Sequence, residues 1–204
     1  MSDRDWTDEL TCFGKVAASV SHEFKNHLAT IREKAGLLSD LLAMQARGKD
    51  VSLARITQLA LDVQKRTVHA DEAVKRLNRF AHSVDHLREE VNMTEAVELA
   101  TGLFFRLATM RGVELKVQPA DDVMVLGSPF AIQQMLLACL DACTLTMSEH
   151  SVLGIGLLKK DGDAVVRFEG CKTVESAPLV ALTQAQHARC DSGPDWFELH
   201  IPMA

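Results

Sequence analysis

The chain has 204 residues, a net charge of −6 and five cysteines. This length suffices for two modest domains, and the acidic balance argues against a nucleic-acid partner or a polybasic membrane face. Five of the first ten residues are charged, no apolar run approaches the ~18 residues of a membrane span, and five scattered cysteines fit reduced thiols, so we expect a cytoplasmic protein with no membrane partner.

The first part of the chain, residues 1–89, has the pattern of a helical hairpin. Apolar residues recur at alternating steps of three and four over residues 7–46, and the spacing resumes after Ser52 and continues to about residue 87. Gly48 lies in the break, and Ser52 suits an N-cap. One hairpin cannot cover so long an apolar stripe, so we expect a homodimer in which two antiparallel hairpins form a four-helix bundle. The expected stripe consists of Phe13, Ala17, Val20, Phe24, His27 or Leu28, Ile31, Ala35, Leu38 and Leu42, then Ile56, Ala60, Val63, Thr67, Ala70, Val74, Leu77, Ala81 and Val84.

The second part, residues 90–204, alternates between helix and strand patterns. Helices are predicted at 94–110, 128–147 and 177–188, and strands at 113–117, 123–126, 151–158, 164–168 and 196–201. Ser128 and Pro129 supply an N-cap and a first-turn proline, and Asp161-Gly162 predicts a hairpin turn. The predicted fold class is therefore α+β, with a helical hairpin followed by an α/β sandwich of helices on one sheet.

A short polar motif, residues 21–26, lies within the first helical pattern. His22 falls midway between the seam positions Val20 and Phe24, so its side chain should face water. An imidazole can attack phosphorus through one ring nitrogen while a neighbouring acid, here Glu23, takes the proton of the other nitrogen. Asn26, one turn further on, could orient a water molecule. These three residues are the candidate catalytic site.

The motif resembles the phosphoacceptor box of bacterial two-component histidine kinases, in which Ser or Ala precedes His-Glu-x-x-Asn and an apolar residue follows. The match consists of Ser21, His22, Glu23, Asn26 and Leu28. His27 stands where the family usually has proline, so the helix should continue without a kink. The order of elements in residues 90–204 resembles the ATP-binding domain of the same kinases, so the resemblance spans essentially the whole chain.

The nucleotide-binding residues of that family are missing from the second part. Aligning Gln134, Leu136 and Leu140 with the family's helix places Ala138 and Ala142 at the positions of two asparagines, one of which holds magnesium. Asp141 is adjacent but should point to a different face. The Asp-x-Gly-x-Gly motif is reduced to Gly170, and no glycine occurs between Gly170 and Gly193 to form a phosphate-binding lid. We therefore expect no cofactor held by this chain.

A phosphoacceptor histidine without an ATP site resembles the dimeric histidine phosphotransferases of phosphorelays. The resemblance implies exchange of a phosphoryl group between His22 and aspartates of response-regulator receiver domains, with Mg²⁺ held by the receiver and the imidazole tautomer held by Glu23. Two alternatives stay open. A divergent sensor kinase would bind ATP, and a non-catalytic dimeric regulator of a kinase would keep its activity after His22→Ala.

Other clusters favour simpler interpretations. Cys139 and Cys143 are one helical turn apart within apolar residues, which favours core packing. A zinc site at Cys171, His187 and Cys190 lacks a fourth ligand, so we expect no metal held by the protein. His82 and His86 suit a solvated face, as do four cations that could steer an acidic partner towards His22: Lys25, Arg32, Arg76 and Arg79.

Overall fold

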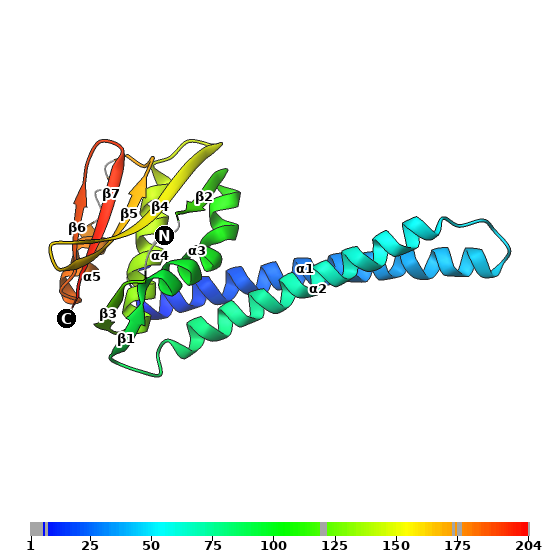
Figure 1. Ribbon diagram of the computed structural model, residues 1–204, viewed down its shortest axis with the longest axis horizontal. Coiled ribbons are helices and arrows are strands. Elements are labelled where there is room, and N and C mark those ends of the chain that lie inside the picture. Colours follow the sequence, from blue (N-terminus) through cyan, green and yellow to red (C-terminus); the bar gives the residue numbers. More distant parts are fainter. Residues whose placement is uncertain (1–5, 7, 119–121, 173, 175–176, 204) are drawn as a thin grey trace. The chain divides into compact units, whose positions relative to one another are not determined.

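The computed structural model of the chain describes residues 6, 8–118, 122–172, 174 and 177–203. Its contacts divide the chain into two compact units: Ala17–Leu77, and Met1–Val16 together with Asn78–Ala204. The predicted α+β architecture is confirmed, with a helical hairpin followed by a mixed sheet and its helices (Figure 1). Residues 89 and 90, where we predicted a domain boundary, lie at the start of the first strand; independent folding of the two parts stays a prediction. Among the described residues, no helix has both the length and the apolar character needed to cross a membrane.

Two long helices make up the hairpin. Helix α1 spans Glu9–Ala46 and helix α2 spans Leu53–His82, and they run antiparallel from a turn that contains Gly48 in the left-handed conformation (Figure 1). Helix α2 ends earlier than the predicted residue 87. Its last turn carries Arg79 and His82, which suit the negative end of the helix dipole. Asp85 then accepts a hydrogen bond from His82 at 2.7 Å, outside the helix.

The second unit contains three further helices and seven strands. The helices are α3 (Met93–Met110), α4 (Pro129–Leu145) and α5 (Ala177–Ala185), and the strands are β1 (Glu89–Asn92), β2 (Val113–Val117), β3 (Met124–Gly127), β4 (Ser151–Lys160), β5 (Asp163–Glu169), β6 (Arg189–Ser192) and β7 (Trp196–Pro202). The side chains of Asn92 and Ser128 cap α3 and α4 at their N-termini.

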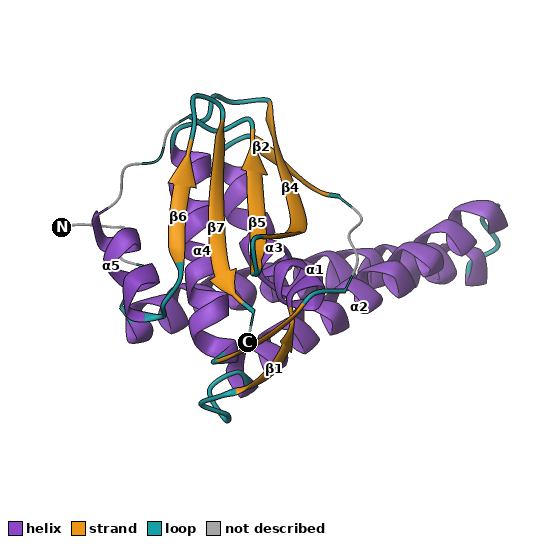
Figure 2. Ribbon diagram, turned by 60° about the vertical axis from the view of Figure 1, so that its left-hand side comes forward, coloured by secondary structure: helices purple, strands orange, loops and turns teal. Residues whose placement is uncertain are grey.

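Five strands form the main sheet in the order β2-β4-β5-β7-β6, and β1 pairs with β3 in a separate two-stranded sheet. Only β2 and β4 are parallel in the main sheet. The β4–β5 turn consists of Asp161 and Gly162, both at positive φ, as the sequence predicted. Helices α3 and α4 lie on one face of the sheet (Figure 2).

The core lies between that face and the helices. Helix α4 is buried along most of its length, and Phe168 of β5 packs on Phe197 of β7, with ring centroids 6.1 Å apart. The sequence pattern missed β1 and β6. Each has only four residues, and Glu-Glu-Val-Asn and Arg-Cys-Asp-Ser lack the alternation of apolar and polar residues by which a half-buried strand is recognised.

Candidate phosphoacceptor site

His22 lies on α1 with an exposed side chain, as its place between the seam residues predicted. Asn26 lies one turn further on, and its carboxamide nitrogen is 3.2 Å from Nδ1 of His22. Residues four apart share one face of a helix, which explains the contact. The structure therefore brings together two of the three predicted site residues, and the hydrogen bond leaves Nε2 of His22 directed away from Asn26.

Glu23 points in another direction. Successive helical residues differ by about 100° around the axis, so the side chains of His22 and Glu23 diverge. The Glu23 carboxylate accepts a hydrogen bond from the guanidinium of Arg76 on α2 at 2.9 Å, and Nε2 of His27 lies 3.7 Å from the same oxygen. Glu23 thus joins the two helices, while the Nδ1 atom it was predicted to hold contacts Asn26.

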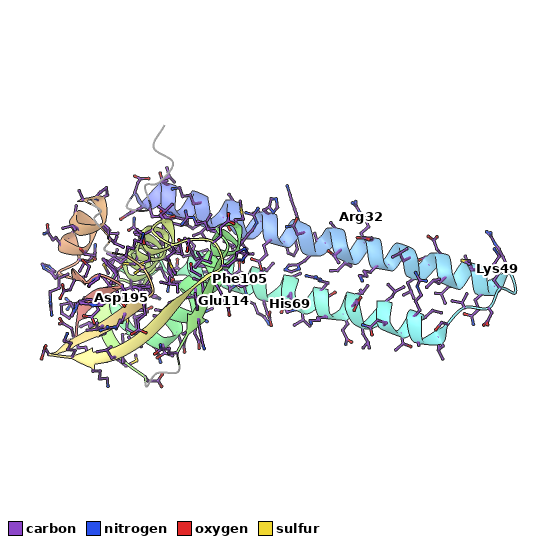
Figure 3. The ribbon with its side chains drawn as sticks, turned by 90° about the horizontal axis from the view of Figure 1, so that it is seen from above. Arg32, Lys49, His69, Phe105, Glu114 and Asp195 are labelled. Atoms are coloured by element: carbon purple, nitrogen blue, oxygen red, sulfur yellow. The ribbon has the colours of Figure 1, made fainter. Side chains whose placement is uncertain are left out.

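His27 and His69 extend this polar layer between the helices. Their rings stack with centroids 6.0 Å apart and an interplanar angle of 25°, and His69 contacts Glu72 at 3.3 Å; Figure 3 labels His69 on α2. Among the described residues, Nδ1 of His27 and Nε of Arg76 are buried without a hydrogen-bond partner. The i to i+4 spacing of Glu23 and His27 could have predicted their contact, but the contribution of α2 could not be read from the sequence.

The apolar residues of the hairpin form a buried set and an exposed set. One part, including Val20, Leu59 and Ala70, is buried within the hairpin unit. The other part stays exposed and follows a strict spacing of seven residues on both helices: Leu28, Ala35 and Leu42 on α1, and Leu53, Ala60, Thr67 and Val74 on α2. We call these seven residues the heptad stripe. On each helix, these residues are rotated in the same direction around the helix axis from the residues that contact the other helix. Because the two helices are antiparallel, both sets therefore lie on one side of the hairpin.

The predicted steering cations have different environments. Lys25 and Arg32 are exposed, and Figure 3 shows Arg32 projecting from α1 on the side away from α2. Arg76 instead binds Glu23, and Arg79 binds Glu95 at 2.8 Å within the other unit. Only Lys25 and Arg32 of the four therefore stay available, among the described residues, to attract an acidic partner.

Helix α4 carries the positions at which the kinase family has asparagines. Ala138 is buried and Ala142 is partly buried, and neither side chain can coordinate a cation. Asp141 is turned towards the end of α3, where its carboxylate accepts a hydrogen bond from Arg111 at 2.6 Å. The predicted different orientation of Asp141 thus has a physical cause, because this ion pair holds the carboxylate.

Cysteines pack against α4 from the strands. The thiols of Cys143 and Cys171 are hydrogen-bonded, as are those of Cys139 and Cys190. The first contact raises the pKa of Cys143 and lowers that of Cys171, while burial raises the pKa of Cys139 well above its usual range. The predicted core packing of Cys139 and Cys143 is confirmed, and these contacts place Cys171, from the segment after β5, and Cys190 of β6 against α4.

The segment after β5 also approaches this region. Gly170 has a φ of +90°, and a Cβ there would lie 2.8 Å from the carbonyl oxygen of Val152. The amide of Lys172 donates to the Thr146 hydroxyl at 3.2 Å. Residues 173, 175 and 176 lie outside the described part of the chain. A cavity of about 440 Å³ at the N-terminal end of α4 is lined by other residues, including Ser128, Ile132 and His187.

No protein-family model matches the chain, and no curated protein matches it. Among solved structures it is similar to the histidine kinase AdeS of Acinetobacter baumannii, with 15% identity and a TM-score of 0.47 over 84% of this chain and 96% of that chain. It is also similar to the histidine kinase ThkA in complex with the response regulator protein TrrA, with 14% identity and a TM-score of 0.49 over 98% of this chain and 64% of that chain. The cytoplasmic segment of the histidine kinase QseC has 11% identity and a TM-score of 0.47 over 67% of this chain and 94% of that chain. Because every TM-score here is below 0.5, the residues of the chain itself carry the proposal below.

Proposed function

We propose that the protein is a histidine phosphotransferase that exchanges a phosphoryl group between His22 and receiver-domain aspartates without using ATP. The observation that carries this proposal is the exposed imidazole of His22 with a carboxamide on its Nδ1 atom. Such an imidazole has one nitrogen fixed by the protein and one nitrogen open to an incoming phosphorus atom.

In the forward step, Nε2 of His22 attacks the phosphorus of a receiver's aspartyl phosphate. The N–P bond forms, the bond from phosphorus to the aspartyl oxygen breaks, and the aspartate leaves as a carboxylate. The reverse step loads another receiver. Positioning and an exposed nucleophile are the main contributions of this chain, and the Mg²⁺ that balances the phosphoryl charge belongs to the receiver.

The tautomer of His22 decides whether this attack can occur. Nε2 is nucleophilic only if the ring proton is on Nδ1, and Nδ1–H then needs an acceptor. The Asn26 carboxamide provides one after a half turn that exchanges the positions of its oxygen and nitrogen. Among the described residues, its side chain makes no other hydrogen bond that would oppose the turn. We therefore assign the tautomer to Asn26, and to Glu23 the positioning of α2 beside His22.

The heptad stripe supports a homodimer. It leaves Leu28, Leu42, Leu53 and Val74 exposed by 47%, 48%, 74% and 37% on one side of the hairpin. Two hairpins that pair through these faces make a four-helix bundle with apolar residues at coiled-coil spacing. His22 lies on a different face of α1, so pairing leaves it accessible to a receiver.

The experiment that tests this function uses the full chain and purified receivers of the same organism, each phosphorylated beforehand. We expect a phosphoryl group on the chain that is stable to base and labile to acid, as a phosphoramidate is, and that maps to His22. Absence of label with every receiver would contradict the proposal. Saturable binding of ATP, or label from ATP, would instead favour the divergent kinase.

A further inference from the structure

We propose that the face of the main sheet opposite α3 and α4 binds a divalent transition-metal ion, with Zn²⁺ as the best-suited probe, through Asp191, Glu198 and His200. The site lies on β6 and β7, in the unit that does not contain His22. It is independent of the phosphotransferase proposal.

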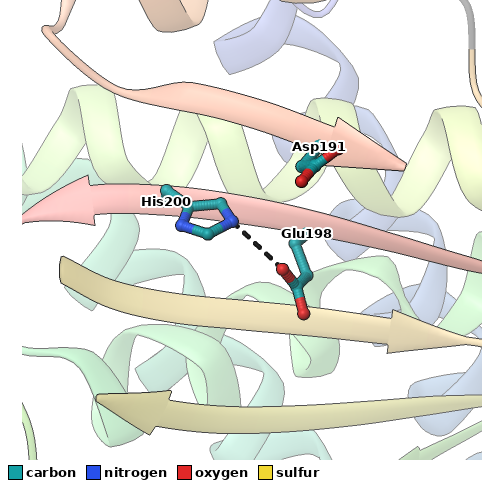
Figure 4. Close-up of side chains that lie close together, drawn as sticks. All are labelled: Asp191, Glu198 and His200. Carbon is teal, nitrogen blue, oxygen red and sulfur yellow. Dashed lines mark hydrogen bonds and ion pairs between the residues drawn. The ribbon is translucent and has the colours of Figure 1, made fainter. Parts of the chain in front are cut away.

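The register of the strands brings the three residues together. Asp191 of β6 is paired with Glu198 of β7, and His200 follows two residues later on the same face of β7 (Figure 4). Phe197 and Leu199 alternate with them and are buried in the core on the other face. The donor atoms of the three residues lie within 4.8 Å of one another, and Nε2 of His200 is 3.1 Å from the Glu198 carboxylate.

Two of these groups are buried although they lie on the sheet face opposite α3 and α4. Glu198 is 2% exposed and His200 is 1% exposed, whereas Asp191 is exposed on the edge strand. Buried charged groups need compensating partners. The exposed Asp191 leaves a route by which an ion and its remaining water ligands can reach the other two donors.

The surrounding cations leave part of the donor set free. Arg167 binds the other oxygen of Glu198 at 2.9 Å, and the Lys160 ammonium lies 3.7 Å from the oxygen that faces His200, on a side chain 49% exposed that can move into solvent. Arg189 binds Asp163 at 3.0 Å. Among the described residues, Asp191 has no cationic partner, and its carboxylate accepts a hydrogen bond only from the backbone amide of Ser192.

A buried nitrogen of His200 gives the second reason. Its Nδ1 atom is buried without a hydrogen-bond partner among the described residues, and the nearest acidic oxygen is that of Asp163 at 3.6 Å. If Nε2 carries the ring proton, the Nδ1 lone pair faces the Asp163 carboxylate. If Nδ1 carries it, Nε2 faces Glu198. A metal ion on Nε2 would give both ring nitrogens a partner, because Nδ1–H then donates to Asp163 as in a carboxylate–histidine–zinc arrangement.

The donor types select the metal. One imidazole and two carboxylates suit Zn²⁺ and its neighbours in the first transition series better than Mg²⁺ or Ca²⁺, which prefer oxygen ligands alone. Three protein donors leave at least one position for water. The sequence analysis expected no protein-held metal because it considered only the cysteines and His187; the pairing of β6 with β7, which it did not predict, creates this cluster.

The test is titration of the full chain with Zn²⁺ by calorimetry and with Co²⁺ by visible absorption. We expect one equivalent to bind, without the cobalt–thiolate charge-transfer band that cysteine ligands would give, and Mg²⁺ in excess should not compete. The exposed Asp191→Ala variant, which should fold normally, is expected to lower the affinity at least tenfold. Asp163→Asn should lower it about tenfold to a hundredfold through the loss of the outer carboxylate.

Asp161→Asn, in the neighbouring β4–β5 turn, is the matched control and should bind as the wild type does. His200→Gln should abolish binding, with circular dichroism to verify its fold. The proposal would be overturned if no ion binds, if a thiolate band shows that cysteines hold the cobalt, or if Asp191→Ala binds as tightly as Asp161→Asn.

Discussion

Helix α1 carries the residues that match the phosphoacceptor box, and helix α4 carries the positions aligned with the kinase asparagines. The two helices differ in whether polar side chains occupy these positions. On α1, His22, Asn26 and Glu23 are polar and each makes a defined contact. On α4, Ala138 and Ala142 occupy the corresponding places, and cysteine thiols pack nearby. A buried apolar pattern is enough to keep a helix in its fold, whereas a reactive site needs particular donors and acceptors. This difference between the two helices is what we expect of the proposed phosphotransferase, which would not use ATP.

The largest effect is expected from a charge placed in the heptad stripe. Val74→Glu should convert the dimer to a monomer, because pairing would bury a carboxylate among the apolar residues of the heptad stripe. Analytical ultracentrifugation measures the change, expected as an increase of at least 100-fold in the dissociation constant. Val68→Glu is the matched control, since Val68 is exposed by 52% on the same helix but lies outside the stripe. Equal effects of the two substitutions would contradict the assigned interface.

The next largest effect concerns the tautomer of His22. Asn26→Ala removes the group that contacts Nδ1 of His22, and should slow phosphoryl transfer by up to about 100-fold. Asn26→Asp keeps an oxygen acceptor and should restore most of the rate. Nitrogen-15 NMR of the imidazole should show the Nδ1–H form decreasing in Asn26→Ala. An unchanged tautomer in that variant would assign this role elsewhere.

A smaller effect is expected where Glu23 joins the helices. Arg76→Ala leaves a partly buried carboxylate without its charged hydrogen-bond donor, so the free energy of unfolding should fall by roughly 1–2 kcal/mol. The exposed Lys75–Asp71 pair supplies the control, and Lys75→Ala should leave the free energy of unfolding almost unchanged. Urea denaturation of both variants measures the difference; a similar loss in both would mean that Arg76 has no special role.

The smallest perturbation probes the packing on α4. The thiol contact with Cys139 lowers the pKa of Cys190, which is also partly exposed, so Cys190 should have the largest thiolate fraction available to a reagent. Burial raises the pKa of Cys12 to about 12 and that of Cys139 well above its usual range, so these two thiols should react later than Cys190. Mass spectrometry after brief alkylation with iodoacetamide near neutral pH gives the order. Early modification of Cys139 would show that this face of α4 is open.

Much of the fold could be predicted because its signals are local. Periodicity located α1, α2, α3 and α4, and Asp161-Gly162 located the β4–β5 turn. Strands β1 and β6 were missed because their pairing with other strands, rather than their own pattern, defines them. Helix ends also differed, as at α2, which ends at His82 and not near residue 87.

The site could be predicted only in part. The exposure of His22 and the nearness of Asn26 follow from helical spacing within one segment. The partner of Glu23 could not be predicted in this way, because Arg76 is 53 residues away and its approach depends on the pairing of the two helices. The same reason applies to Asp191 and His200, which come together only through the register of β6 and β7.

Phosphoryl transfer through His22 without ATP can be tested by measuring relay of a phosphoryl group between two receivers in a buffer free of nucleotide. One receiver is phosphorylated and purified, and the appearance of phosphate on the second is followed with and without the chain. We predict transfer that requires the chain, is lost in His22→Ala and persists in His86→Ala, which changes another exposed histidine. Transfer that survives in His22→Ala, or that appears only when ATP is added, would contradict the account.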